Sequence, residues 1–210
     1  MEKFWLKSYP PGVPAEIDPD SYRSLVQLME EAFGKYADRQ AYICMGKSLR
    51  FAELDILSQQ LAAFLQAQGL SPGARVALMM PNVLQYPVAI AAVLRAGFTV
   101  VNVNPLYTPR ELEHQLNDSG AEVIIVLENF AHTLERVITR TPVRVAVLAS
   151  MGDMLGPIKG SVVNFVVRNL KKLVPAYELP NAIRFKQALR EGASQTLLLA
   201  QPHHDDIAFL

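Results

Sequence analysis

The residues best suited to acid–base or metal chemistry are four histidines and one cysteine. His114 and His132 fall within predicted helices without neighbouring ligands, so a solvent-facing or core position is the favoured interpretation. His203 and His204 precede two aspartates in a polar stretch that is more typical of a loop than of a metal site. A lone Cys44 excludes an internal disulfide and a cysteine-based zinc site. Its apolar surroundings favour a buried small residue over a reactive thiol.

The motifs that would place a complete active site are absent. The sequence holds no GxGxxG or GxxxxGK[ST] phosphate-binding turn, no GxSxG nucleophile elbow and no HExxH zinc motif. The adjacent acids Glu30 and Glu31 are interpreted as the solvated face of a helix. The residues alone therefore indicate a ligand-binding topology without a recognisable catalytic apparatus.

Composition narrows the class of protein. The 210 residues include 20 basic and 20 acidic side chains, and this neutral balance argues against a dedicated nucleic-acid binder. Half of the residues are apolar, which is enough for a sizeable core. The N-terminus lacks the apolar core of a signal peptide, and no apolar run reaches the length of about 18 residues that a membrane span requires. The expected location is the cytoplasm.

Residues 75–127 alternate between apolar runs and helical patterns. The runs at 75–80, 98–103 and 122–127 are predicted strands, and the segments 82–97 and 108–120 are predicted helices. Strands joined by single helices pair in parallel, so the fold class is α/β with a mostly parallel sheet, a βαβαβ core flanked by helices. Ligands in such sheets bind beyond the carboxyl ends of the strands.

The helix boundaries in this region are set by local chemistry. Asn82 is a predicted cap for the first helix, although Pro87 favours a start nearer Tyr86. Thr108 and Glu111 predict a capping box for the second helix, with proline at its first position. Gly97 and Gly120 are predicted to end the two helices.

The flanking sequence divides into further predicted segments. Residues 1–20 form a proline-rich extended arm with Trp5 and Tyr9, which either packs on its own domain or reaches a second subunit. The expected organisation is an arm at 1–20, an α/β subdomain at 21–149, a loop with a basic helix at 150–181, and the start of a next subdomain at 182–210. Within these segments we predict helices at 21–36, 52–68, 130–139 and 186–191, a small hairpin at 41–51, and strands at 143–148, 182–185 and 206–210.

Residues 161–174 predict a basic amphipathic helix. Between Met154 and Tyr177 the charged residues are all basic, and Arg168, Lys171 and Lys172 are the candidates to face a membrane. An ordinary surface helix packed on the core is the plainer interpretation. Both remain open at this point.

Consecutive segments of the chain resemble the acyl-adenylate-forming enzymes. Residues 48–54, SLRFAEL, resemble an L-T-Y-x-E-L motif in which Arg50 and Phe51 replace threonine and tyrosine. Residues 75–82, RVALMMPN, resemble the D-R-V-A-x-x-x-P-N run of that family. Residues 104–121, NPLYTPRELEHQLNDSGA, are closer still to the long-chain fatty acid–CoA ligases of bacteria. Further segments with the same resemblance are residues 5–14, 94–105, 129–135 and 162–167.

The resemblance implies an activity for a longer parent protein. Such an enzyme joins a long-chain fatty acid to coenzyme A through acyl-AMP, using ATP and Mg²⁺. It also implies an apolar tunnel for the fatty acid, and the candidates for its wall are the strand-end residues Met80, Asn102, Asn104 and Tyr107. Turn structure and packing are the plainer explanation of these four.

The same resemblance suggests where coenzyme A would lie. Related enzymes place the helix equivalent to residues 108–119 near the CoA nucleotide, which makes Arg110 and His114 candidate phosphate contacts. No residue matches a catalytic one, and no metal site is expected within the chain.

The resemblance further implies that the chain is the N-terminal part of such an enzyme, because the family's phosphate-binding loop would follow Leu210. We expect the isolated chain to bind no cofactor and to be inactive, and a homodimer through the N-terminal region is expected. Two alternatives stay open: an adenylate-forming ligase for another acyl or aryl acid, and a non-catalytic stand-alone α/β interaction domain. Peripheral contact with the inner face of the cell membrane is a separate expectation.

Overall fold

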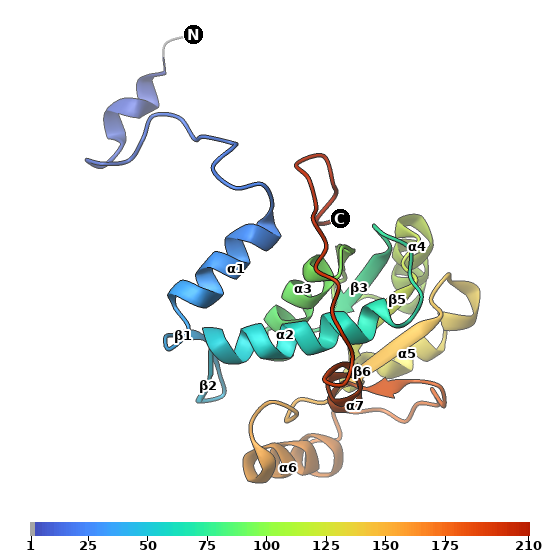
Figure 1. Ribbon diagram of the computed structural model, residues 1–210. Helices are drawn as coiled ribbons and strands as arrows, with labels where there is room; N and C mark the ends of the chain where they lie inside the picture. Colours follow the sequence, from blue (N-terminus) through green and yellow to red (C-terminus); the bar gives the residue numbers. More distant parts are fainter. Residues whose placement is uncertain (1–2) are drawn as a thin grey trace.

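A five-stranded parallel sheet forms the centre of the computed structural model, which describes residues 3–210 (Figure 1). Its strand order is β4-β3-β5-β6-β7, and every neighbouring pair is parallel. The predicted α/β class with a mostly parallel sheet is therefore confirmed. The strands are β3 (Arg75–Met79), β4 (Thr99–Asn102), β5 (Val123–Leu127), β6 (Val145–Ala149) and β7 (Ile183–Arg184).

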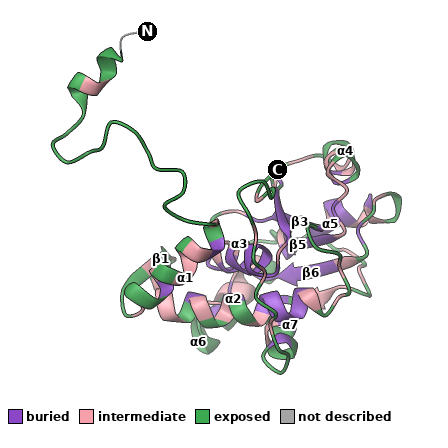
Figure 2. Ribbon diagram, turned by 45° about the horizontal axis from the view of Figure 1, so that its top comes forward, coloured by how far each residue is buried: buried purple, intermediate pink, exposed green. Residues whose placement is uncertain are grey.

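Alternate strand residues belong to two separate apolar cores, as the period of two in a strand requires. Val76, Leu78 and Ile125 belong to the core beneath α2 (Phe51–Gln66), α3 (Gln85–Arg95) and α7 (Phe185–Gly192). Ala77 and Ile124 belong to the other core, beneath α4 (Pro109–Ser119) and α5 (Ala131–Glu135). Strands β3, β4, β5 and β6 are accordingly almost entirely buried (Figure 2).

The start and end of α4 follow the sequence prediction. The Thr108 hydroxyl accepts from the Glu111 N–H at 3.4 Å, and the Glu111 carboxylate accepts from the Thr108 N–H at 2.8 Å. Gly120 ends the helix in the left-handed conformation, at φ 64°.

The start of α3 differs from the prediction at Asn82, which makes no cap. The helix begins at Gln85 without a side-chain cap, so Pro87 falls within its first turn. The two residues before the helix, Val83 and Leu84, are buried in the core beneath α2 and α3.

A small hairpin and α1 cover one side of α2. The hairpin consists of β1 (Gln40–Cys44) and β2 (Lys47–Arg50), and its turn lies at Met45 and Gly46, one residue earlier than predicted. α1 (Leu25–Lys35) begins at Ser24, whose hydroxyl accepts from the Gln27 N–H at 3.2 Å.

The arm before α1 extends away from the sheet (Figure 2). It contains one 3₁₀ turn, η1 (Phe4–Ser8), and its side chains are almost all exposed. Met1 and Glu2 of the predicted arm lie outside the described residues.

The helix predicted at 161–174 lies earlier in the chain, at 157–170, and residues 171–174 fall outside it. α6 (Pro157–Phe165) begins inside the predicted loop, because Gly156 adopts φ 86° and Pro157 occupies the first helical position. α6 continues as a π-helix, η4 (Val166–Leu170). The predicted helix at 130–139 is divided into η2 (Glu128–Phe130), α5 and η3 (Ile138–Arg140).

The last thirty residues lie on the same sheet. β7 pairs with β6, and Phe185 of α7 is fully buried. Val100 of β4 donates to the Ala208 carbonyl at 2.9 Å and accepts from the Leu210 N–H at 2.8 Å, so residues 208–210 lie beside β4. A domain boundary near residue 182 stays a prediction.

Candidate functional site

The carboxyl ends of five parallel strands meet at one edge of the sheet, which makes this edge the candidate site. Polar residues occur there because each strand is followed by a turn or a helix. The residues at or directly after the strand ends are Met80, Asn102, Glu128, Ser150 and Arg184. Sequence reasoning singled out the first two and missed the last three.

Asn102 ties β4 to two helices. The Tyr86 hydroxyl donates to Asn102 Oδ1 at 2.5 Å, and Gln115 Nε2 donates to the Asn102 carbonyl at 2.9 Å. Burial raises the pKa of the Tyr86 hydroxyl, so Tyr86 stays a neutral donor at physiological pH. Gln115 Oε1 is buried and has no partner among the described residues.

The other three predicted wall residues have different environments. Met80 is buried in the core beneath α2 and α3. Asn104 is exposed, and its side chain accepts from the Leu106 N–H at 3.0 Å, which is the turn role weighed for it above. Tyr107 is half-buried against the core beneath α4. A shared role for the four as a tunnel wall stays a prediction.

Arg110 and His114 lie one turn apart on α4. Both are exposed, while Leu112 and Leu116 form the buried face of the helix. Neither side chain has a hydrogen bond or ion pair within residues 3–210. A phosphate contact at these two residues stays a prediction.

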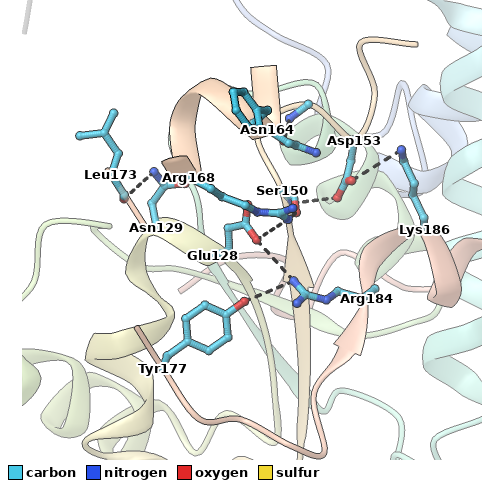
Figure 3. A network of polar contacts seen from close by, with 12 residues as sticks. Glu128, Asn129, Ser150, Asp153, Asn164, Arg168, Leu173, Tyr177, Arg184 and Lys186 are labelled. Carbon is cyan, nitrogen blue, oxygen red and sulfur yellow. Dashed lines mark hydrogen bonds and ion pairs between the residues drawn. The ribbon is translucent and has the colours of Figure 1, made fainter. Parts of the chain in front are cut away.

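A buried carboxylate at the end of β5 organises the opposite part of the edge (Figure 3). The side chain of Glu128 is only 2% exposed and accepts two hydrogen bonds from Arg168, at 3.0 and 2.7 Å. Arg184 of β7 donates to the same carboxylate at 3.4 Å and to the Tyr177 hydroxyl at 3.3 Å. The bidentate pair raises the pKa of the Arg168 guanidinium.

Ser150 extends this network beyond β6. Its hydroxyl accepts from Arg168 at 2.9 Å, and its carbonyl accepts from the Gln85 side chain at 2.7 Å. Its N–H donates to Asp153 at 2.7 Å, and Lys186 lies 3.7 Å from the same carboxylate. Burial raises the pKa of Asp153. The network thus links β5, β6, β7, α3 and η4.

The basic residues predicted to face a membrane are divided between two environments. Arg168 directs its guanidinium inward to Glu128. Lys171 and Lys172 follow η4 and are exposed. Asn129 donates to the Leu173 carbonyl at 2.9 Å and so fixes the chain just after the two lysines.

Two basic side chains share one buried carboxylate at this edge. Arg168 and Arg184 both pair with Glu128, so these three groups together keep one net positive charge. No group of three metal-ligating side chains occurs within residues 3–210.

The opposite edge carries a groove of about 1280 Å³. It lies between α1, the amino ends of β3 and β4, and residues 198–208. Leu25 and Leu28 of α1 line it, and His203 and His204 lie at its margin. His204 Nε2 donates to the Tyr22 carbonyl at 2.7 Å, and His204 Nδ1 lies 3.8 Å from the Asp20 carboxylate.

Comparisons with known proteins assign a family. Residues 29–210 match the sequence profile of the family described as AMP-binding enzyme. The long-chain-fatty-acid–CoA ligases of Salmonella typhimurium and Haemophilus influenzae are 56% and 48% identical to the whole chain. The chain spans 38% of the length of each.

A solved structure shares the fold. The crystal structure of a long-chain-fatty-acid–CoA ligase from Archaeoglobus fulgidus superposes with a TM-score of 0.69 at 23% identity. The match covers 96% of this chain and 36% of that protein, and at this identity it shows the fold alone. No helix within residues 3–210 is long and apolar enough to cross a bilayer.

Proposed function

Because the chain belongs to the family of AMP-binding enzymes, we propose that it is the N-terminal part of a long-chain fatty acid–CoA ligase. The carboxylate of the fatty acid attacks the α-phosphate of ATP, which releases pyrophosphate and gives acyl-AMP. The thiol of coenzyme A then attacks the acyl carbon and releases AMP. Mg²⁺ offsets the phosphate charge in the first step.

The observation that carries this proposal is the extent of the similarity. The match to the Salmonella ligase runs over the whole chain at 56% identity, with no segment left out. The motif order in residues 48–121 supports the same assignment. Because the chain spans 38% of that relative, we place the catalytic residues and the ATP phosphate loop in the remainder of the whole protein.

The described residues have supporting roles in this proposal. Met80, Asn102, Asn104 and Tyr107 contribute one wall of the fatty acid site at the carboxyl edge. Arg110 and His114 face the phosphates of coenzyme A; their exposure and lack of partners within residues 3–210 support this role.

An acid-selectivity assay tests the proposed substrate. The whole protein is incubated with ATP, Mg²⁺, coenzyme A and either oleate, octanoate or benzoate, and each acyl-CoA is quantified. We expect oleoyl-CoA to form with the highest kcat/KM. A preference for benzoate would instead assign the protein to another adenylate-forming ligase, and the absence of every thioester would favour the interaction-domain alternative.

We also place the protein in the cytoplasm, as a homodimer that pairs through the arm. The exposed Phe4, Trp5 and Tyr9 support this arrangement, because aromatic residues are enriched in protein interfaces. Sedimentation of the whole protein with and without residues 1–20 tests it. A dimer that survives removal of the arm would contradict the proposal.

A further inference from the structure

The last residues of the chain pair with β4 as the beginning of one more parallel strand. The Leu210 N–H donates to the Val100 carbonyl at 2.8 Å. The Asn102 N–H in turn donates to the Leu210 carbonyl at 3.2 Å. Hydrogen bonds between parallel strands are evenly spaced and involve every second residue. The next acceptor in this ladder is therefore the Asn102 carbonyl, and its donor would be the N–H of the second residue after Leu210.

A side chain of α4 already uses this acceptor. Gln115 Nε2 donates to the Asn102 carbonyl at 2.9 Å. The Tyr86 hydroxyl donates to Asn102 Oδ1 at 2.5 Å, so the end of β4 is held by α3 as well as by α4. Gln115 thus stands at the position where the ladder would continue.

The other end of the Gln115 amide lacks a donor. Its Oε1 is buried and has no hydrogen-bond partner within residues 3–210. Buried acceptors are rarely left unpaired in native proteins, because the lost hydration is costly. A side-chain amide offers one acceptor and an N–H donor, the same two groups that a peptide unit offers. Gln115 can therefore bridge β4 and a neighbouring backbone as a peptide unit would.

The residues before Leu210 are fixed at several points. Gln66 Nε2 donates to the Leu198 carbonyl at 2.7 Å, and Gln66 Oε1 accepts from the Leu198 N–H at 3.0 Å. The Thr99 hydroxyl donates to the Ile207 carbonyl at 2.8 Å. These contacts place Leu210 beside the end of β4, so the backbone that follows begins next to Gln115.

We propose that Gln115 ends the ladder after Leu210 and positions the segment that follows in the whole protein. Gln115 Nε2 keeps the Asn102 carbonyl, and Gln115 Oε1 accepts a backbone N–H from one of the next few residues. An amide inserted between two strands holds them apart, so the new strand diverges from β4 at the carboxyl edge. Parallel sheets bind ligands in a crevice at this edge, and the divergence leaves room for one.

This role rests on the proposed function, in which the chain continues beyond Leu210 and the ATP phosphate loop lies in the remainder of the whole protein. It adds a positioning residue to that function. Gln115 acts through the backbone that it holds, and we assign it no contact with the reacting atoms.

Hydrogen exchange of the whole protein, measured by mass spectrometry without substrates, tests the contact. Gln115→Met keeps the length of the side chain and removes both hydrogen bonds. We expect amide exchange directly after Leu210 to become about 3- to 10-fold faster, as the loss of one hydrogen bond predicts. An unchanged exchange rate in this variant would overturn the proposal.

Asn117 provides a matched control on the same helix. Its Nδ2 donates to the Glu113 carbonyl at 2.9 Å and to the Arg140 carbonyl at 3.1 Å. Asn117→Leu therefore weakens α4 without touching β4, and exchange after Leu210 should stay at the wild-type rate. Equal acceleration in both variants would assign the effect to α4 as a whole and contradict a specific role of Gln115.

Steady-state kinetics on the same samples separate positioning from a general loss of structure. A phosphate-binding segment that is held less firmly binds ATP more weakly in the ground state and the transition state alike. We expect the KM for ATP to rise about 3- to 10-fold in Gln115→Met, while kcat changes less than about twofold. A fall in kcat at an unchanged KM for ATP would contradict this role. A wild type that forms no oleoyl-CoA would refute the proposed function instead, and the exchange measurement would still decide the role of Gln115.

A crystal structure of the whole wild-type protein decides the question even if Gln115→Met does not fold. Gln115 Oε1 should lie about 2.7–3.2 Å from a backbone nitrogen that follows Leu210. A ladder bond from that segment to the Asn102 carbonyl, with Gln115 Oε1 paired elsewhere, would rule the proposal out.

Discussion

Arg95 is the most deeply buried charged side chain among the described residues, with none of its side chain exposed. Its guanidinium donates to Glu30 at 2.7 Å and to the Ser58 hydroxyl at 2.7 Å, pairs with Asp55, and lies 4.8 Å from the Phe33 ring centroid. Glu31 lies on the predicted solvated face, and Glu30, whose side chain is 38% exposed, in addition pairs with buried Arg95. The Glu30 carboxylate compensates the buried positive charge of Arg95, a residue of α3.

The two adjacent glutamates of α1 allow a matched test of this role. Glu30→Gln leaves Arg95 with one carboxylate fewer, and we expect a loss of about 1.5–3 kcal/mol in the free energy of unfolding. Glu31→Gln affects only an exposed contact with Gln27 and should change stability by less than about 0.5 kcal/mol. Urea unfolding of both variants measures the difference, and equal losses would contradict the assigned role.

Asp153 predicts a specific dependence of stability on pH. Burial raises its pKa in the folded state, so the folded protein holds this proton more tightly than the unfolded chain. The tighter binding of this proton stabilises the folded protein below the ordinary pKa of about 3.9. This stabilisation is lost as pH rises through the raised pKa of the folded state. Asp153→Asn removes this loss and leaves an acceptor for the Ser150 N–H.

We therefore expect the unfolding free energy of Asp153→Asn, relative to the wild type, to increase with pH across that window. The increase amounts to about 1.4 kcal/mol per pKa unit of the shift. Urea titrations at several pH values measure it. Asp118→Asn, at an exposed position, is the control, and a parallel increase in that variant would rule Asp153 out as the cause.

At the scale of elements, α7 approaches α2 so closely that only glycine is tolerated at Gly192. A Cβ there would lie 1.8 Å from the Gln60 carbonyl oxygen, which belongs to the backbone of α2. Gly192→Ala must push the two helices apart, and we expect a loss of about 1–3 kcal/mol.

Gly34 of α1 is the matched control, because a Cβ there meets nothing within 4 Å. Gly34→Ala should stabilise the protein by about 0.5–1 kcal/mol through helix propensity. Thermal unfolding compares the two variants. A neutral Gly192→Ala would mean that α7 packs more loosely than described.

The elements that sequence reasoning located correctly depend on local chemistry. The caps of α4 involve residues within one helical turn, so Thr108, Glu111 and Gly120 could be assigned from spacing alone. For α3, Pro87 correctly indicated a start near Tyr86, whereas the cap predicted at Asn82 is absent. The extension of α6 into a π-helix had no sequence signal.

Only some residues of the candidate site could be predicted, because the others come together only in the folded sheet. Asn102 was found because a polar residue at a strand end is visible in sequence. Glu128 follows a buried strand in the same way, and this signal was available for it too. Its partners Arg168 and Arg184 lie 40 and 56 residues further along, and only the folded sheet brings them together.

At the scale of the whole molecule, the sheet separates the polar network from the groove. The carboxyl edge carries the polar network and the predicted substrate contacts, and η4 is fixed to that edge through Arg168. The apolar groove lies at the amino edge, beside α1. The proposed fatty acid site therefore lies at the end of the sheet opposite the groove.

The 210-residue chain by itself should be inactive, because we place the catalytic residues and the ATP phosphate loop in the remainder of the whole protein. We expect no oleoyl-CoA when the purified chain is incubated with ATP, Mg²⁺, coenzyme A and oleate, while the whole protein forms it. Turnover by the chain alone would show that the described residues include the catalytic ones.

The most direct test of the central claim follows the oxygen atoms of the fatty acid. The whole protein is given oleate labelled with oxygen-18 in its carboxylate, together with ATP, Mg²⁺ and coenzyme A, and the nucleotide products are analysed by mass spectrometry. Reaction through acyl-AMP predicts that AMP carries one labelled oxygen, that oleoyl-CoA keeps the other in its thioester carbonyl, and that pyrophosphate is unlabelled. Formation of ADP, or of AMP without label, would contradict the assignment to an acyl-adenylate-forming ligase.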